Sequence, residues 1–271
     1  MTRDRRRVTT DEKIVTRDER RGTTDGGAES LLTIPALEML AGIRHACTTR
    51  QGGLGARTNG FKLLDDWDRV ADAFGISSDR LVTAIQVHGD TIVTVGQGNY
   101  NKVRSLEADA MITAEPGIAI GVETADCVPV LLVDPATPAV GAVHAGWRST
   151  VRRIIQKAVR RMQDEFGSDP ARMIAAIGPA IGPECYEVDE PVMGPVREAF
   201  PFWQEVSSSR GSGRWSLDLV KANTIELVEA GLARSNVHAL GMCTSCRRDL
   251  FYSFRAEGRT GRMLSAVMIK L

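Results

Sequence analysis

The feature that most constrains the fold is a series of short apolar segments separated by very short links between residues 108 and 144. The segments 108–113, 118–123, 127–134 and 139–144 are rich in Val, Ile and Ala, which is typical of buried strands. The links "AEPG" and "PATP" are too short for the crossover that parallel neighbours require. We therefore expect these strands to pair as antiparallel hairpins.

Apolar periodicity predicts the other elements. Apolar residues at i, i+3 and i+4 spacing predict the clearest helix over 150–166, with a solvated, arginine-rich outer face. A second helix is predicted over 217–232, and weaker patterns predict helices over 65–74 and 189–199. Further strands are expected over 42–50, 81–88, 173–178, 237–242, 251–255 and 264–270. The alternation predicts one α/β domain over residues 29–271, with a mixed, largely antiparallel sheet and helices packed on it.

Composition and charge exclude several function classes. The 271 residues carry no formal net charge, whereas nucleic-acid binders normally carry a basic surplus. No stretch approaches the roughly 20 apolar residues that span a bilayer, so no membrane partner is expected. Residues 1–28 hold mixed charge, Thr and Gly without an apolar signal core, which predicts a disordered polar tail and a cytoplasmic protein. The five cysteines are widely spread, which argues against a disulfide framework.

Cys127 and His144 stand at the ends of two segments that the link "PATP" joins. A turn centred between Pro135 and Ala136 pairs residues whose numbers add up to 271, so that Cys127 faces His144. Facing residues share one side of a sheet, with Cβ atoms roughly 4.5–5.5 Å apart. A slip of one residue would place them on opposite faces. The spacing therefore favours a single site that contains both side chains.

His88 closes the predicted strand 81–88 and is the third candidate. One cysteine and two histidines match a catalytic zinc site with an open fourth position. The same ligand set also accepts copper, but four histidines in the whole chain cannot build a histidine-rich multinuclear centre. A metal-free cysteine hydrolase or amidase is the alternative, with Cys127 as the nucleophile and His144 as its base.

Other residues suggest how a substrate is bound near this site. Ser149 is a candidate N-cap for helix 150–166, and with Arg148 beside it the helix start favours an anion such as phosphate. Gln86 would share the strand face of His88. Asp126, next to Cys127, either supports the metal ligands from behind or is a solvated acid at the strand end. "CTSC" (243–246) resembles half of a zinc or redox motif, and His45 and His238 are expected to be structural.

Six motifs in order resemble the YfiH-like family of polyphenol oxidase or laccase-domain proteins, regarded as purine nucleoside phosphorylases with adenosine deaminase activity. The motifs are "QVHGD", "ADAMIT", "TADCVPVLL", "AVHAGWRST", "IGPAIGPECYEV" and "FYSFRAEGRTGRM". The resemblance runs from Leu31 to the C-terminus and implies an α/β sandwich, with nucleoside and phosphate as substrates and zinc as the cofactor. It implies zinc ligands at His88, Cys127 and His144, and pocket residues at Arg50, Gln86, Arg148 and Arg255.

The chain departs from the family pattern in three places. The loop after "TRQGG" is abbreviated, and only Asn59 corresponds to the family's Ser-Leu-Asn segment. The polar tail and the "CTSC" pair are not general features of the family. The shortened loop affects the expected substrate pocket and leaves the expected metal ligands unchanged.

Overall fold

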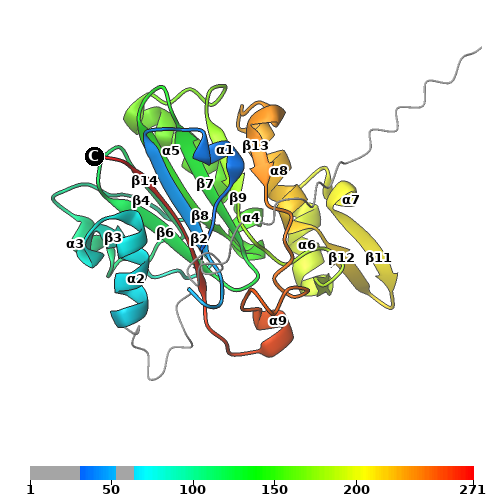
Figure 1. The fold of residues 1–271 in the computed structure, drawn as a ribbon. Helices are drawn as coiled ribbons and strands as arrows, with labels where there is room; N and C mark the ends of the chain where they lie inside the picture. Colours follow the sequence, from blue (N-terminus) through cyan, green and yellow to red (C-terminus); the bar gives the residue numbers. More distant parts are fainter. Residues whose placement is uncertain (1–30, 53–63) are drawn as a thin grey trace, which may run out of the picture.

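The protein forms two stacked β-sheets with helices on both outer faces, as the computed structural model in Figure 1 shows. The structure describes residues 31–52 and 64–271; the expected tail (residues 1–28) and Asn59 lie outside them. The α/β class and the mixed, largely antiparallel pairing are confirmed. The strands are divided among three sheets. The two larger sheets bury their apolar faces against each other, and the third is a small sheet of three strands.

A six-stranded sheet carries two of the three candidate ligands at or next to its strand ends. Its pairs are antiparallel except for the two parallel edge pairs, and its order is β13 (Val237–Ala239), β9 (Ile174–Ile177), β7 (Val128–Asp134), β8 (Ala139–Ala145), β5 (Ala110–Thr113) and β4 (Ile92–Thr94). Side chains alternate between faces along each strand. Val130 and Leu132 therefore pack with α5 (Ile154–Phe166) and α8 (Leu219–Glu229), whereas Leu131 and Val133 face the second sheet.

The second sheet has five strands, in the order β1 (Leu31–Leu32), β2 (Ile43–Thr48), β14 (Met263–Ile269), β6 (Ala119–Thr124) and β3 (Leu81–Val82). Along β14, Val267 and Ile269 face the core between the sheets, while Ala266 and Met268 pack against α2 (Leu64–Phe74). Burying one such aliphatic side chain stabilises the fold by about 1.5–3 kcal/mol. The result is four layers, helix–sheet–sheet–helix, in which the central strands are apolar on both faces.

Smaller elements extend one end of this sandwich. The three-stranded sheet β10–β12–β11 lies beside α6 and α7, in yellow in Figure 1. The remaining bounds are β10 (Glu187–Val188), β11 (Ser207–Gly211), β12 (Arg214–Leu217), α1 (Pro35–Glu38), α3 (Tyr100–Val103), α4 (Trp147–Val151), α6 (Glu190–Ala199), α7 (Trp203–Val206), α9 (Phe254–Glu257) and the 3-10 turns Ser78–Arg80 and Arg234–Asn236. No helix within the described ranges has the length and apolarity needed to cross a bilayer.

The hairpin predicted at "AEPG" is wrong. β5 pairs with β8 and β4, whereas β6 pairs with β14 and β3, so the short link carries the chain from one sheet to the other. Both strands are buried on both faces. Their sequences therefore give no alternation that would distinguish a hairpin from a step between layers. The antiparallel hairpin at "PATP", between β7 and β8, is confirmed.

The predicted helix 150–166 is interrupted, and its predicted N-cap is wrong. α4 begins after Gly146, so Ser149 lies inside the helix. The chain then turns at Arg153, whose left-handed φ of 62° separates α4 from α5. The Arg153 guanidinium forms an ion pair with the buried Glu226 of α8 and donates to the Ala199 carbonyl. These contacts stabilise a backbone conformation that a non-glycine residue seldom adopts.

Two predicted strands are mostly irregular. The segment 81–88 is a strand only at Leu81–Val82, and the chain then loops to His88. The segment 251–255 leads into α9, where the Ser253 hydroxyl caps the helix by accepting from the Ala256 amide at 3.3 Å. Both segments are apolar enough to resemble strands, but both form the rim of a pocket.

Candidate metal centre

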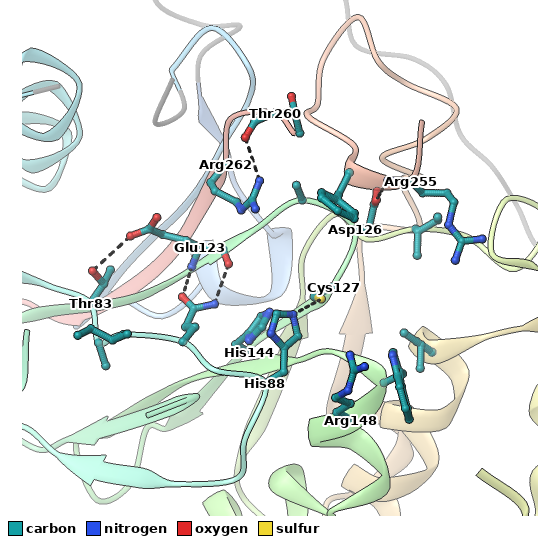
Figure 2. Close-up of a pocket in the computed structure, with 18 of the residues that line it drawn as sticks. Thr83, His88, Glu123, Asp126, Cys127, His144, Arg148, Arg255, Thr260 and Arg262 are labelled. Atoms are coloured by element: carbon teal, nitrogen blue, oxygen red, sulfur yellow. Dashed lines mark hydrogen bonds between the residues drawn. The ribbon is translucent and has the colours of Figure 1, made fainter. Parts of the chain in front are cut away.

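His88, Cys127 and His144 come together in one pocket, where Figure 2 shows their side chains directed toward one another. Their ligand atoms all lie within 4.8 Å of one another. His88 Nε2 is 3.8 Å from Cys127 Sγ, and the two imidazole rings are 4.9 Å apart at 72°. His144 is buried, Cys127 is partly buried and His88 is exposed, so the cluster opens toward the pocket.

The register of the β7–β8 hairpin differs from the predicted one by two residues. Pro129 pairs with His144, so paired residue numbers add up to 273. The loop is longer because the Asp134 carboxylate accepts from the amides of Ala136 and Thr137, at 2.9 and 3.1 Å. Cys127 therefore does not directly face His144. The shift is even, which keeps both residues on the same face of the sheet.

The buried carboxylate of Asp109 organises both histidines. Its Oδ1 lies 2.7 Å from His144 Nδ1, and it accepts from the amides of Val87, His88 and Gly89 at 3.2, 3.0 and 2.6 Å. The first contact places a proton on His144 Nδ1 and leaves Nε2 free to bind a metal. The amide contacts hold His88 in a left-handed conformation, with φ of 58°.

Asp109 is a residue of the candidate site that the sequence analysis missed. It stands in the motif "ADAMIT", directly before the apolar strand β5. A fully buried aspartate is rare unless it has partners. An acid in an otherwise apolar strand was therefore the available signal.

The thiol and the imidazole influence each other's protonation. Burial raises the pKa of Cys127, but His144 and His88 outweigh it and lower the pKa to about 6. Burial lowers the pKa of His144, but the Cys127 thiolate and Asp109 raise it to about 9. Without a metal, the pair is therefore a thiolate beside an imidazolium at neutral pH. A metal cation would take the place of the imidazolium proton.

Gly146 leaves room at the centre of the cluster. A Cβ atom at this position would lie 3.0 Å from both Cys127 Sγ and His88 Cδ2. The φ of Gly146 is −71°, which any residue can adopt, so the requirement for glycine is purely steric. The backbone between β8 and α4 therefore lies so close to Cys127 and His88 that only a residue without a side chain fits at position 146.

The Gly146→Ala variant is expected to bind zinc about 10–100-fold more weakly, because the methyl group displaces one or both neighbouring ligands. Chelator competition with the purified variant measures this affinity. Gly42→Ala is the matched control, since a Cβ at Gly42 meets no atom within 4 Å. Equal zinc affinity in the two variants would contradict the proposed ligand geometry.

The cluster opens into a cavity of about 900 Å³, large enough for a small-molecule substrate. Its lining includes five arginines and four aromatic residues: Arg104, Arg148, Arg255, Arg259, Arg262, Trp67, Trp147, Tyr186 and Phe254. In Figure 2, Arg148 and Arg262 lie on opposite sides of the three candidate ligands. The cavity thus offers positive charge for an anion and flat apolar faces for a ring system.

Of the four other predicted pocket residues, three line the cavity and Arg50 does not. Arg148 and Arg255 line the cavity; Arg148 stacks on Trp147 at 4.4 Å, and Arg255 lies over Tyr186 at 4.9 Å. Arg50 is not among the lining residues, because it forms an ion pair with Glu257 and stacks on Tyr252.

Gln86 lines the cavity, but its amide is already engaged. Its Nε2 donates to the Glu123 carbonyl and its Oε1 accepts from the Glu123 amide, both at 2.8 Å. The side chain thereby replaces a strand pairing where β3 has ended. Gln86 holds the loop before His88 against β6, which is a positioning role.

Asp126 is buried and connects the Cys127 segment to the C-terminal part of the chain. Its carboxylate accepts from the Thr244 hydroxyl and from the Arg255 amide, each at 2.6 Å. Its φ of 94° is strained for a non-glycine residue. Of the two alternatives for Asp126, a solvated acid does not fit this burial.

Comparison with known proteins places the chain in a family. Residues 44–270 match the family described as multi-copper polyphenol oxidoreductase laccase. The chain belongs to this laccase family. The resemblance read from the six sequence motifs is thereby confirmed.

Relatives of this laccase-family chain include two enzymes and a solved structure. A purine nucleoside phosphorylase from Deinococcus radiodurans is 37% identical over 253 residues, covering 87% of this chain and 94% of the relative. Adenosine deaminase RL5, from an unknown prokaryotic organism, is 34% identical and covers 76% and 84%. The crystal structure of Bacillus licheniformis hypothetical protein YfiH has a TM-score of 0.82 at 32% identity, covering 89% and 97%.

The donor set of this laccase-family chain fits a single zinc ion. Tetrahedral zinc bonds of about 2.0–2.3 Å place ligand atoms roughly 3.3–3.6 Å apart, close to the 3.8 Å between His88 Nε2 and Cys127 Sγ. His45, in β2, accepts a hydrogen bond from the Ile34 amide, and His238 lies in β13. Two of the four histidines of the chain therefore remain for the site. A histidine-rich multicopper centre cannot be built from this set.

Proposed function

We propose that the protein is a zinc-dependent purine nucleoside enzyme, which cleaves adenosine, inosine or methylthioadenosine with phosphate and also deaminates adenosine. The observation that carries the proposal is the three-ligand cluster of His88, Cys127 and His144, which opens into an arginine-rich cavity. Catalytic zinc sites typically combine three protein ligands with an open position. Relatives named as purine nucleoside phosphorylase and adenosine deaminase support both reactions.

The cavity walls supply separate contacts for base and phosphate. Phe254 is 57% exposed and lines the cavity, so its ring is accessible for stacking on a purine. Arg148 reaches the cavity from the first turn of α4, and charge-assisted hydrogen bonds from arginine suit phosphate oxygens. Arg148 is therefore the first candidate for the phosphate site.

In phosphorolysis, a phosphate oxygen bonds to C1′ of the ribose as the C1′–N9 bond breaks. The electron pair leaves with the purine, which takes the proton that the hydrogen phosphate gives up, and the products are ribose 1-phosphate and the free base. In deamination, water adds at C6 and ammonia leaves. His88, Cys127 and His144 would hold the zinc ion, which would supply Lewis acidity and would lower the pKa of a water molecule in the open position to about 7. Asp109 contributes by fixing the His144 tautomer.

Incubation of the full chain with adenosine, with and without phosphate, tests the proposal. With phosphate we expect adenine and ribose 1-phosphate, and without phosphate we expect inosine and ammonia. Chromatography and mass spectrometry identify these products. Intact adenosine under both conditions, with zinc bound, would overturn the proposed reactions.

Replacing Arg148 with alanine is expected to raise the Michaelis constant for phosphate by about tenfold or more, since a charge-assisted hydrogen bond is worth roughly 1.5–3 kcal/mol. Deamination consumes water and should change much less. Steady-state assays of both reactions on the same preparation measure the difference. Arg160→Ala, on the exposed face of α5, is the control. An equal loss of both activities together with thermal stability would assign Arg148 a structural role.

A metal-free cysteine hydrolase or amidase is the second candidate, and the lowered pKa of Cys127 favours it. His144 would then act as the base that takes the thiol proton, and as the imidazolium it would return that proton to the leaving group. This candidate requires full activity in protein that contains no metal. A copper-dependent phenol oxidase would use the same three ligands, but the described lining residues include no methionine, the usual weak axial ligand of blue-copper sites.

A further inference from the structure

Three thiols outside the proposed active site converge on one point. Cys185 lies in the loop between β9 and β10, and Cys243 and Cys246 belong to the "CTSC" segment. Their sulfur atoms all lie within 4.8 Å of one another, and Cys185 Sγ is 3.3 Å from Cys246 Sγ. Cys185 and Cys243 are partly buried and Cys246 is exposed. The missing partner of the "CTSC" pair is therefore a single cysteine, 58 residues upstream of Cys243.

The backbone holds this cluster in place. Ala180 and Cys243 form a parallel bridge, in which the Ala180 amide donates to the Met242 carbonyl and the Thr244 amide donates to the Ala180 carbonyl. These bonds measure 3.2 and 3.1 Å. The two loops are thus paired by main-chain hydrogen bonds next to the thiols, and the cluster does not depend on flexible side chains alone.

Backbone amides also converge on one sulfur. The Gly182 amide donates to Cys243 Sγ at 3.2 Å, and together with the nearby amides of Ser245 and Cys246 it lowers the pKa of this thiol. Hydrogen bonds to a thiolate favour the charged form, which is the form that binds metals. The two-residue spacing of Cys243 and Cys246 is also typical of zinc-binding cysteine pairs.

We propose that Cys185, Cys243 and Cys246 form a second metal site, which binds a thiophilic divalent cation such as zinc through three thiolates. Each thiol releases its proton on binding, and the exposed side at Cys246 leaves the fourth position to water. The third sulfur favours a metal over a disulfide, because a disulfide would use two of the thiols and leave the third unpaired beside it. The proposal uses residues separate from the nucleoside site.

A metal at this position would hold one wall of the nucleoside cavity. Ile181 and Tyr186 line the cavity from the loop that contains Cys185. Thr244, between the other two cysteines, donates to Asp126, the neighbour of Cys127. The ion would therefore cross-link two loops that are far apart in sequence and adjacent to the proposed active site. Its expected role is to stabilise this wall.

Zinc stoichiometry in the full chain tests the proposal. We expect two zinc ions per wild-type chain and one in each of Cys185→Ser and Cys246→Ser. Ser245→Ala keeps all three thiols and the backbone amide, so it should retain two. In the Cys127→Ser background, added Co²⁺ should still give a thiolate-to-cobalt charge-transfer band, which disappears when Cys185→Ser is added. This background separates the second site from the first.

Two results would overturn the second site. One is an unchanged zinc content in both Cys185→Ser and Cys246→Ser, measured on protein whose circular dichroism matches wild type. The other is a wild-type mass lower by two hydrogen atoms under non-reducing conditions, with a Cys185–Cys246 disulfide and no second zinc. If Cys185→Ser fails to fold, the exposed Cys246→Ser variant decides the question alone.

Discussion

Replacing Cys127 with serine is expected to remove the zinc ion of the nucleoside site and to reduce adenosine turnover by about a thousandfold, which corresponds to ~4 kcal/mol. The thiolate is the only anionic ligand among the three, and His144 and His88 both stabilise it. A serine hydroxyl stays protonated at neutral pH and cannot replace that charge. Metal analysis and adenosine assays on the same preparation give both quantities.

Cys47→Ser is the matched control for this prediction. Cys47 is a buried thiol in β2 that accepts a hydrogen bond from the Ser265 hydroxyl at 3.3 Å. It belongs to neither of the two candidate metal sites. The same chemical change there should leave the zinc content and the turnover close to wild type. A Cys127→Ser protein that retains both zinc ions would contradict the ligand assignment, whatever its activity.

Replacing Asp109 with alanine is expected to lower the free energy of unfolding by about 3 kcal/mol or more, because three backbone amides lose a buried acceptor. Zinc affinity should fall about 10–100-fold as well, because His144 loses the partner of Nδ1. Asp109→Asn keeps an acceptor oxygen for the amides, so it should retain more stability while still weakening zinc. Denaturant unfolding and chelator competition measure the two effects.

Asp134→Ala provides the control for Asp109. Asp134 is also a buried aspartate that accepts from two backbone amides, but it holds the β7–β8 turn at the opposite end of the hairpin from Cys127. Its loss should reduce stability without changing zinc affinity. If both variants weaken zinc equally, the effect of Asp109 on the metal is a consequence of general destabilisation.

The sequence predicted the juxtaposition of Cys127 and His144 by reasoning that was only partly correct. The predicted register requires a two-residue turn, whereas Asp134 organises a four-residue loop. Because side chains alternate with a period of two, an even error in register preserves the face. An error of one residue would have separated the pair, and the two prolines of the link gave no means to exclude it.

The division of the strands into two sheets could not be predicted from local sequence. β5 and β6 are buried on both faces, so neither strand shows the polar alternation that marks an exposed side. The link between them has the same length and turn residues as a hairpin. The main partner of β6 is distant in sequence, because β14 follows β6 by more than a hundred residues. Such long-range pairing is decided by tertiary packing.

The position of His88 was predicted for a reason that the structure does not support. His88 does not end a strand. It lies in a loop, in a left-handed conformation that the carboxylate of Asp109, directly before β5, stabilises. Loop geometry of this kind depends on a buried acceptor provided by another element. The residue types, two histidines and one cysteine, indicate a metal site. The placement of His88 depends on its contact with Asp109, about 20 residues further along the chain.

The most direct test of the account is adenosine turnover by chelator-stripped protein before and after zinc is restored. We expect the stripped chain to be inactive, and added zinc to restore turnover in wild type and in Cys185→Ser but not in Cys127→Ser. Comparable turnover by stripped protein, verified to contain no metal, would contradict the zinc-dependent site and would favour the cysteine nucleophile instead.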